Sequence, residues 1–329
     1  MSKLSRKLLI SVLSLVFALV TLGTTTFAWF TLTGTVAVDS IDMNVSAGYG
    51  IEISVDGGNT YKNLITMNDL KAALGLSSGV SSLKTLESLT TNDGINFYTL
   101  DEIGKTSPTS TTNGYLQFDI WFRTTTQNAK VYLDNGTSIT STAKNWISDA
   151  AFTYKKYDNN EVKTVNVSVG ETVPVYAANS ARFSFQEMVY SGTNLVGKED
   201  GLVTIWELNP DISNNTNTLL GTEPNASLGL VSYWNAKYPN DNLLNYYYQD
   251  VDNKVVKEGI ITLPQTVKSN SNLGSSTIIL NLDQTKSGDN TYKYGYLRVR
   301  IWLEGWDPDN FDAIFDTNLK VKYVFSLTV

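Results

Sequence analysis

The sequence YLQFDIWF, residues 115–122, indicates the fold class, because its side chains alternate with a period of two. Four large apolar residues fall on one face of the extended chain, as in a half-buried β-strand: Leu116, Phe118, Ile120 and Phe122. The same alternation recurs in residues 297–303 and 319–329. Many such strands, each with one buried face, favour a mainly β fold in which antiparallel strands form a β-sandwich.

The alternation also runs through the N-terminal segment, but it changes phase near Asp39 and Ser40. Four apolar residues before that point share one parity: Phe30, Leu32, Val36 and Val38. Four after it share the other: Ile41, Met43, Val45 and Ala47. A strand changes phase only where an extra residue or a turn intervenes, so we expect a β-bulge or a turn there.

Signals for helices and turns are few. We expect Asn68 and Asp69 to cap a short helix that ends at Gly75, and at most one further short helix. Residues 134–136, Asp-Asn-Gly, predict a turn of the hairpin type. Residues 208–275 are rich in Asn, Gly, Ser and Tyr, which predicts a loop-rich insertion in one β-sandwich domain of residues 29–329.

Residues 1–28 have the pattern of a cleavable secretory signal peptide. Three basic residues precede an apolar stretch, residues 8–22, and small residues then lead to Ala28. That order is typical of export signals. An uncleaved membrane anchor is the alternative, although a full span needs roughly 20 apolar residues. We predict cleavage between Ala28 and Trp29, and an extracellular protein, secreted or on the cell surface, that contacts the membrane only before cleavage.

The composition limits which partners the protein can bind and which interactions can stabilise its fold. The chain has 329 residues and a formal charge of −7, and cleavage after Ala28 would remove three basic residues and bring the charge to −10. An acidic protein is a poor partner for nucleic acid or anionic lipid, which both attract clustered Lys and Arg. Cysteine is absent, so disulfides cannot stabilise the exported protein.

Two patterns resemble catalytic or nucleotide-binding motifs but lack essential parts. Residues 75–79 match G-x-S-x-G, yet the chain has no histidine to take a serine proton. Residues 192–198 match G-x-x-x-x-G-K, but Glu199 replaces the metal-binding hydroxyl. A carboxylate pair for glycoside hydrolysis stays open as an alternative, although no feature marks one. We predict that the chain is not an enzyme.

Oxygen ligands leave calcium as the one metal to consider, because zinc sites rely on histidine and cysteine. Asp307, Asp309 and Asp312 surround a turn in the sequence and are candidate calcium ligands. The simpler interpretation is that Asp, Pro and Asn form the turn itself. No other cofactor is expected.

Several aromatic residues are candidates for stacking on sugars: Tyr246, Tyr247, Tyr248, Trp234 and Trp302. Such residues pack equally well inside a sandwich or an interface. A glycan or another surface ligand is therefore a possible partner, and the alternative function is that of a monomeric secreted adhesin or carbohydrate-binding β-sandwich.

The predicted mature N-terminus, residues 29–38, is an apolar strand with no turn before it. Such a strand pairs either within its own sheet or with the open edge of a neighbour, where backbone hydrogen bonds give affinity. Gly34 in its middle would suit a close approach between backbones. For a generic β-protein the intramolecular arrangement is the commoner one.

Three segments together resemble the TasA/camelysin-type surface proteins: residues 27–31 after the signal peptide, residues 180–185 with 204–209, and residues 299–309. The resemblance covers about a quarter of the chain, and residues 208–275 have no counterpart in it. It implies a jelly-roll sandwich that assembles into cell-surface or biofilm-matrix fibres by donating its N-terminal strand to the next subunit. The donated residues would be Phe30, Leu32, Gly34, Val36 and Val38. Some members are classed as metallopeptidases, which the absence of histidine does not support here.

Overall fold

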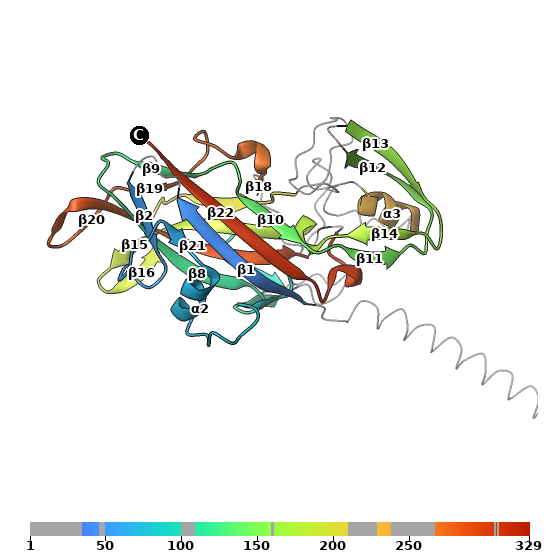
Figure 1. Cartoon of the computed structure of the whole chain (residues 1–329), viewed down its shortest axis with the longest axis horizontal. Helices are drawn as coiled ribbons and strands as arrows, with labels where there is room; N and C mark the ends of the chain where they lie inside the picture. Colours follow the sequence, from blue (N-terminus) through green and yellow to red (C-terminus); the bar gives the residue numbers. More distant parts are fainter. Residues whose placement is uncertain are drawn as a thin grey trace, which may run out of the picture.

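The computed structural model describes residues 35–45, 50–99, 109–158, 161–209, 229–237, 267–305, 307 and 309–329 (Figure 1). The predicted signal peptide, the cleavage site at Ala28 and Trp29, and the predicted donor residues Phe30, Leu32 and Gly34 lie outside these residues.

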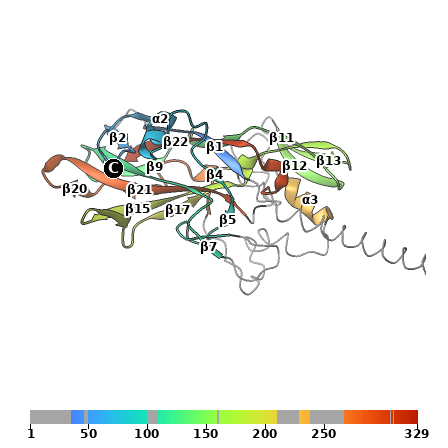
Figure 2. The same ribbon diagram turned by 90° about the horizontal axis from the view of Figure 1, so that it is seen from below.

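The described chain is mainly β, and two large sheets pack as a sandwich (Figure 2). The seven-stranded sheet has the order β19 (Ile278–Asn281), β9 (Lys130–Leu133), β22 (Asn318–Thr328), β1 (Val36–Val45) and β3 (Leu64–Ile65), with β10 (Ser138–Ser141) on β22 and β4 (Thr85–Leu86) on β1. The eleven-stranded sheet has the order β18 (Val267–Lys268), β17 (Val203–Trp206), β15 (Ala181–Ser191), β21 (Asp289–Glu304), β5 (Ser88–Thr90), β6 (Phe97–Thr99) and β7 (Thr109–Thr111). Beside that path lie β16 (Asn194–Gly197), β20 (Gln284–Lys286), β8 (Leu116–Thr124) and β2 (Ile51–Ser54).

The core lies between the two sheets and confirms the predicted sandwich. The alternate residues of β8 that the sequence marked as apolar are all buried. Aromatic rings join the layers: Phe122 of β8 meets Phe325 of β22 at 5.1 Å between ring centroids, and Phe183 of β15 meets Tyr323 of β22 at 5.1 Å. Most strand pairs are antiparallel, whereas β1–β22, β5–β21 and β17–β18 are parallel.

The turn at residues 134–136 does not form the predicted hairpin. Strands β9 and β10 both pair antiparallel with β22, so the chain keeps its direction through the turn. The turn follows the edge of β22 because Asp134 N–H donates to Val324 O, and Val324 N–H donates to Thr137 Oγ1. A break in one strand therefore gives the same sequence signal as a reversal.

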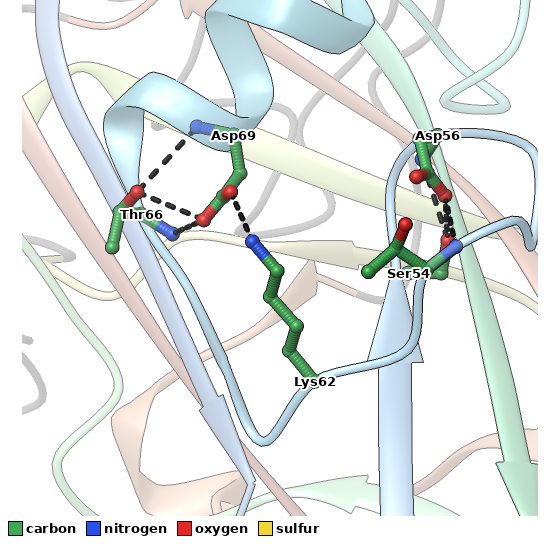
Figure 3. A network of polar contacts seen from close by, with 6 residues as sticks. Ser54, Asp56, Lys62, Thr66 and Asp69 are labelled. Atoms are coloured by element: carbon green, nitrogen blue, oxygen red, sulfur yellow. Dashed lines mark hydrogen bonds and ion pairs between the residues drawn. The ribbon is translucent and has the colours of Figure 1, made fainter.

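Helix α2 (Met67–Ala73) confirms a short helix before Gly75, but its cap is Thr66, not Asn68 or Asp69. Thr66 Oγ1 accepts from the Asp69 N–H, and the Asp69 carboxylate accepts from the Thr66 N–H, which forms a capping box (Figure 3). Lys62 pairs with the same carboxylate. Asp69 is thus the third residue of the helix and helps to cap it.

A smaller group of elements lies beside the sandwich in both views (Figures 1 and 2). It contains the paired strands β11 (Lys144–Ile147) and β14 (Thr172–Val175), the paired strands β12 (Phe152–Asp158) and β13 (Glu161–Val167), and helix α3 (Gly229–Lys237). Tyr233 of α3 packs on Trp146 at 4.6 Å and donates to Asp149. Within residues 208–275, the structure describes Leu208 and Asn209, α3, β18 and the segment that follows β18. Neither described helix is long and apolar enough to cross a membrane.

Candidate functional site

Strand β1 begins the described chain and pairs with its last strand. It runs parallel to β22, with Ala37 opposite Asn318 and Val45 opposite Phe325. The register shifts between Val38 and Ser40, which confirms the β-bulge expected from the change of phase. Because of that shift, residues from both phases point inward, and four are fully buried: Val36, Val38, Ile41 and Met43.

Two of the five predicted donor residues therefore fill the core of their own chain. Val36 and Val38 have no exposed surface, and β1 pairs within its own sheet, which is the intramolecular alternative. The physical reason is that β22 is long enough to accept β9 and β10 on one edge and β1 on the other. Without β1, that second edge of β22 would have no strand.

The other edge of β1 is held much less completely. It pairs with β4 at Val36 and Ala37, and with β3 at Met43 and Asn44, two residue pairs in each case. Between these short contacts lie residues 39–42, which have no strand partner on this side in the described chain. One continuous ladder, with β22, thus carries most of the pairing of β1, while the buried side chains anchor it.

A second site is a buried ionic cluster around Arg182 of β15, which has no exposed side-chain surface. Arg182 Nη2 donates to Glu207 Oε2 at 2.8 Å. Arg182 Nη1 lies 3.5 Å from Glu304 Oε2, and Nη2 lies 3.9 Å from Asp307 Oδ2. All three carboxylates are buried, so one guanidinium balances several charges in a medium where unpaired charge is very costly.

Asp309 adds a fourth buried acid beside this cluster. Its burial, and then the charge of the neighbouring Asp307, raise the pKa of Asp309 well above its usual range, although a hydrogen bond from Asn179 acts in the opposite direction. Burial beside Asp307 therefore disfavours the charged form of Asp309 in the folded protein. The cluster is closed to solvent, so its chemistry is that of a structural tie between segments.

The cluster also joins two of the three segments that carry the family resemblance. Arg182 belongs to residues 180–185, Glu207 to residues 204–209, and the other acids to residues 299–309. After the last segment, the chain passes through the 3₁₀ turn Asp312–Ile314 and reaches the start of β1, where Asp316 N–H donates to Thr35 O, and Ala37 N–H donates to Thr317 O. The sequence showed these segments in order, but only the fold shows that they meet.

The three calcium candidates do not form a metal site. Asp307 faces Arg182, Asp309 is buried beside it, and Asp312 lies in the separate 3₁₀ turn Asp312–Ile314, where burial raises the pKa of its carboxyl. Among the described residues, no three Asp, Glu, His or Cys side chains are placed to hold a metal ion. The positive charge near Asp307 comes from the guanidinium of Arg182, where the sequence had suggested a calcium ion.

Two of the five aromatic residues expected to stack on sugars are not available for that role. Trp302 is fully buried and Trp234 nearly so, while residues 246–248 lie outside the described chain. Sequence reasoning missed a different aromatic group on the outer face of the eleven-stranded sheet, where Trp121 Nε1 donates to Tyr190 Oη at 3.1 Å. Its only sequence signal was the odd-numbered phase of β8, opposite to the core residues.

The two motif-like segments have ordinary structural roles. Residues 75–79 follow the end of α2 as a mostly exposed turn. Lys198, the lysine of the second pattern, has its ammonium group 2.8 Å from Glu187 and 3.0 Å from Asp283. That lysine is therefore already committed to two carboxylates and is badly placed to hold a phosphate.

Comparison with known proteins gives no support from relatives: no family model, no characterised protein and no solved structure matches this chain. The resemblance to the TasA/camelysin-type proteins therefore stays a prediction from the three sequence segments.

Proposed function

We propose that this chain is an exported, non-enzymatic structural subunit that assembles into cell-surface or matrix fibres by exchanging its N-terminal strand between copies. The observation that carries the proposal is the place of β1: first in the described chain, fully buried on one face, and held by one long ladder to the C-terminal strand. The predicted signal peptide supports export.

Strand exchange follows from the physics of that ladder. If β1 leaves its own chain, β22 offers an open edge and an apolar groove that the β1 of another identical chain fits in the same register. The backbone pairing and burial that β1 gives up in its own chain are thus restored between two chains. When each copy gives its strand to the next and the arrangement does not close into a ring, the product is an open filament.

A pair of introduced cysteines tests the exchange directly. Asp42 and Lys322 are exposed and opposite each other in the β1–β22 register, and the chain has no cysteine of its own. Neighbouring strands lie about 4.8 Å apart, within the Cα separation of roughly 4.4–6.8 Å that a disulfide spans. The substitutions D42C and K322C therefore link either one chain or two, according to where β1 pairs.

The expected result is that oxidation of assembled protein gives a ladder of covalent oligomers on a non-reducing gel. Oxidation before assembly should instead lock β1 in its own chain and block fibres until a reductant is added. The matched control, D42C alone, can form dimers but no ladder. A version that begins at Ser40 should not polymerise. The proposal fails if residues 29–329 stay monomeric by size exclusion and electron microscopy, or if oxidised fibres dissolve into monomers.

The monomeric adhesin is the alternative, and the same experiment separates it, because an adhesin of that kind needs no strand exchange. Trp234 and Trp302, two of its candidate residues for sugar contact, are buried.

A further inference from the structure

The outer face of the eleven-stranded sheet carries neighbouring rows of side chains set by strand register. Trp121 of β8 lies opposite Tyr296 of β21, which lies opposite Met188 of β15. The next row contains Asp119, Arg298 and Gln186 in the same strand order. Because alternate residues of these strands face the core, both rows point away from it. A row of two aromatic side chains and a methionine, which we call the aromatic row, therefore borders a polar row; within the aromatic row Tyr296 and Met188 are buried, and Trp121 is the partly exposed member.

The aromatic row is rigid before any ligand arrives. Trp121 Nε1 donates to Tyr190 Oη at 3.1 Å, and Tyr190 meets Tyr296 edge to face at 5.1 Å between centroids. Tyr190 is nevertheless 42% exposed. Aromatic side chains fixed in this way lose little conformational entropy when a ligand covers them.

The polar row is also fixed and has no net charge. Arg298 donates to both oxygens of Asp119, from Nε at 2.8 Å and from Nη2 at 2.9 Å. These two side chains keep 24% and 19% of their surface exposed. Arg300 donates to Gln117 Oε1 and to Gln186 Oε1, which orients both amides. Planar donors and acceptors are thus held at the surface beside the rings.

Segments from other parts of the chain bound this surface at its two ends. At one end Ser184 Oγ donates to Gly94 O, so the residues before β6 cover the sheet there. At the other end the guanidinium of Arg123 lies between the rings of Tyr61 and Tyr292, 4.1 and 4.4 Å from their centroids. The two rows lie between these covered ends.

We propose that this outer face, formed by Trp121, Tyr190, Asp119, Arg298 and Gln117, binds a neutral polysaccharide chain. A sugar ring has apolar C–H groups on its faces and hydroxyls on its edge, and the hydroxyls both donate and accept hydrogen bonds. The aromatic side chains would pack against the C–H groups on the face of the sugar ring. The planar polar groups in the next row would form hydrogen bonds with the hydroxyls on its edge. Asp119 and Arg298 neutralise each other, and the one further charge, on Arg300, sits on a side chain that is only 5% exposed, so little charge reaches the surface to attract a charged polymer.

Affinity electrophoresis of the full chain tests the proposal. Native gels would contain β-glucan, xylan, galactomannan or hydroxyethylcellulose as neutral probes, and alginate or heparin as charged probes. We expect at least one neutral polysaccharide to retard the protein. W121A and Y190A should each weaken that retardation at least tenfold. The matched control is Y132A on β9, a partly exposed tyrosine on the outer face of the other sheet, and it should bind as the wild type does.

Melting curves show whether each variant folds. If W121A unfolds, Y190A and Q117A still test the proposal. Tyr190 and Gln117 are exposed, so replacing them removes less packing from the fold than replacing Trp121 does. The proposal is overturned if no neutral polysaccharide retards the protein, if only charged probes do, or if Y190A and Q117A bind as tightly as Y132A. Loss of self-association in Y190A with no polysaccharide binding would assign the face to a protein partner instead.

Discussion

Replacing Arg182 with methionine should destabilise the protein far more than the same replacement of an arginine at the surface. Methionine keeps much of the side-chain length but removes the guanidinium from Glu207, Glu304 and Asp307, which lie within 2.8–3.9 Å of it. Arg182 and its three partners are all buried. Removing one partner of a buried ionic pair leaves the other charge uncompensated and costs about 3–5 kcal/mol.

Arg298 supplies the matched control, because it pairs with Asp119 through two hydrogen bonds of ordinary length. Its side chain is 24% exposed, so water partly replaces the missing interaction. We therefore expect R298M to lose about 1 kcal/mol or less. The residue type and the substitution are the same in both variants, so the difference in their stability loss measures the effect of burial.

The assay is urea unfolding at neutral pH, followed by tryptophan fluorescence, with the free energy of unfolding taken from midpoint and slope. The difference between the two variants should be at least about 2 kcal/mol. The cost of R182M should shrink in acid, because neutral carboxyl groups tolerate burial without a cation. If R182M loses no more stability than R298M, the cluster does not tie its three segments together.

Two further predictions concern single buried groups. The pKa of Asp309 is raised in the folded state, so its contribution to stability is present below the pKa of a free aspartate and declines as the pH rises toward the folded value. D309N cannot titrate, so its stability relative to the wild type should increase as the pH rises above about 4 in urea unfolding, and a difference that is constant with pH would contradict the assignment. The hydroxyl of Tyr323 is buried with no hydrogen-bond partner among the described residues. Y323F should therefore raise the free energy of unfolding by about 1–2 kcal/mol, and a loss of stability in thermal or urea unfolding would mean that the hydroxyl has a partner.

Much of the fold could be predicted because burial acts on each strand separately. The period-two pattern of β8 and the change of phase at Asp39 and Ser40 are local, and both appear in the structure as expected. Prediction from the sequence was wrong where one local pattern is compatible with two different structures. The turn residues 134–136 would suit a hairpin between two strands that pair with each other. In the structure they instead separate two strands, β9 and β10, that both pair with β22.

The sites were harder to predict because they depend on contacts between distant segments. Arg182 and its acids come from three separate parts of the chain, and nothing near Asp307 or Asp309 indicates that a guanidinium lies opposite. The aromatic outer face posed the same difficulty. Trp121 stood in the polar phase of a strand, and its partner Tyr190 is 69 residues away.

The pairing of β1 with β22 has a consequence for assembly that follows from chain length alone. These strands lie at opposite ends of the described chain, so their ladder closes a loop of nearly the whole domain. Pairings of such long range form late in folding, because the entropy of closing the loop must first be overcome. Until then the edge of β22 is open to any β1. Within one chain that strand stays tethered to its own edge of β22, which favours the closed monomer in dilute solution. Under the proposed function, exchange between copies would be favoured only where chains are crowded, as at the end of a growing fibre.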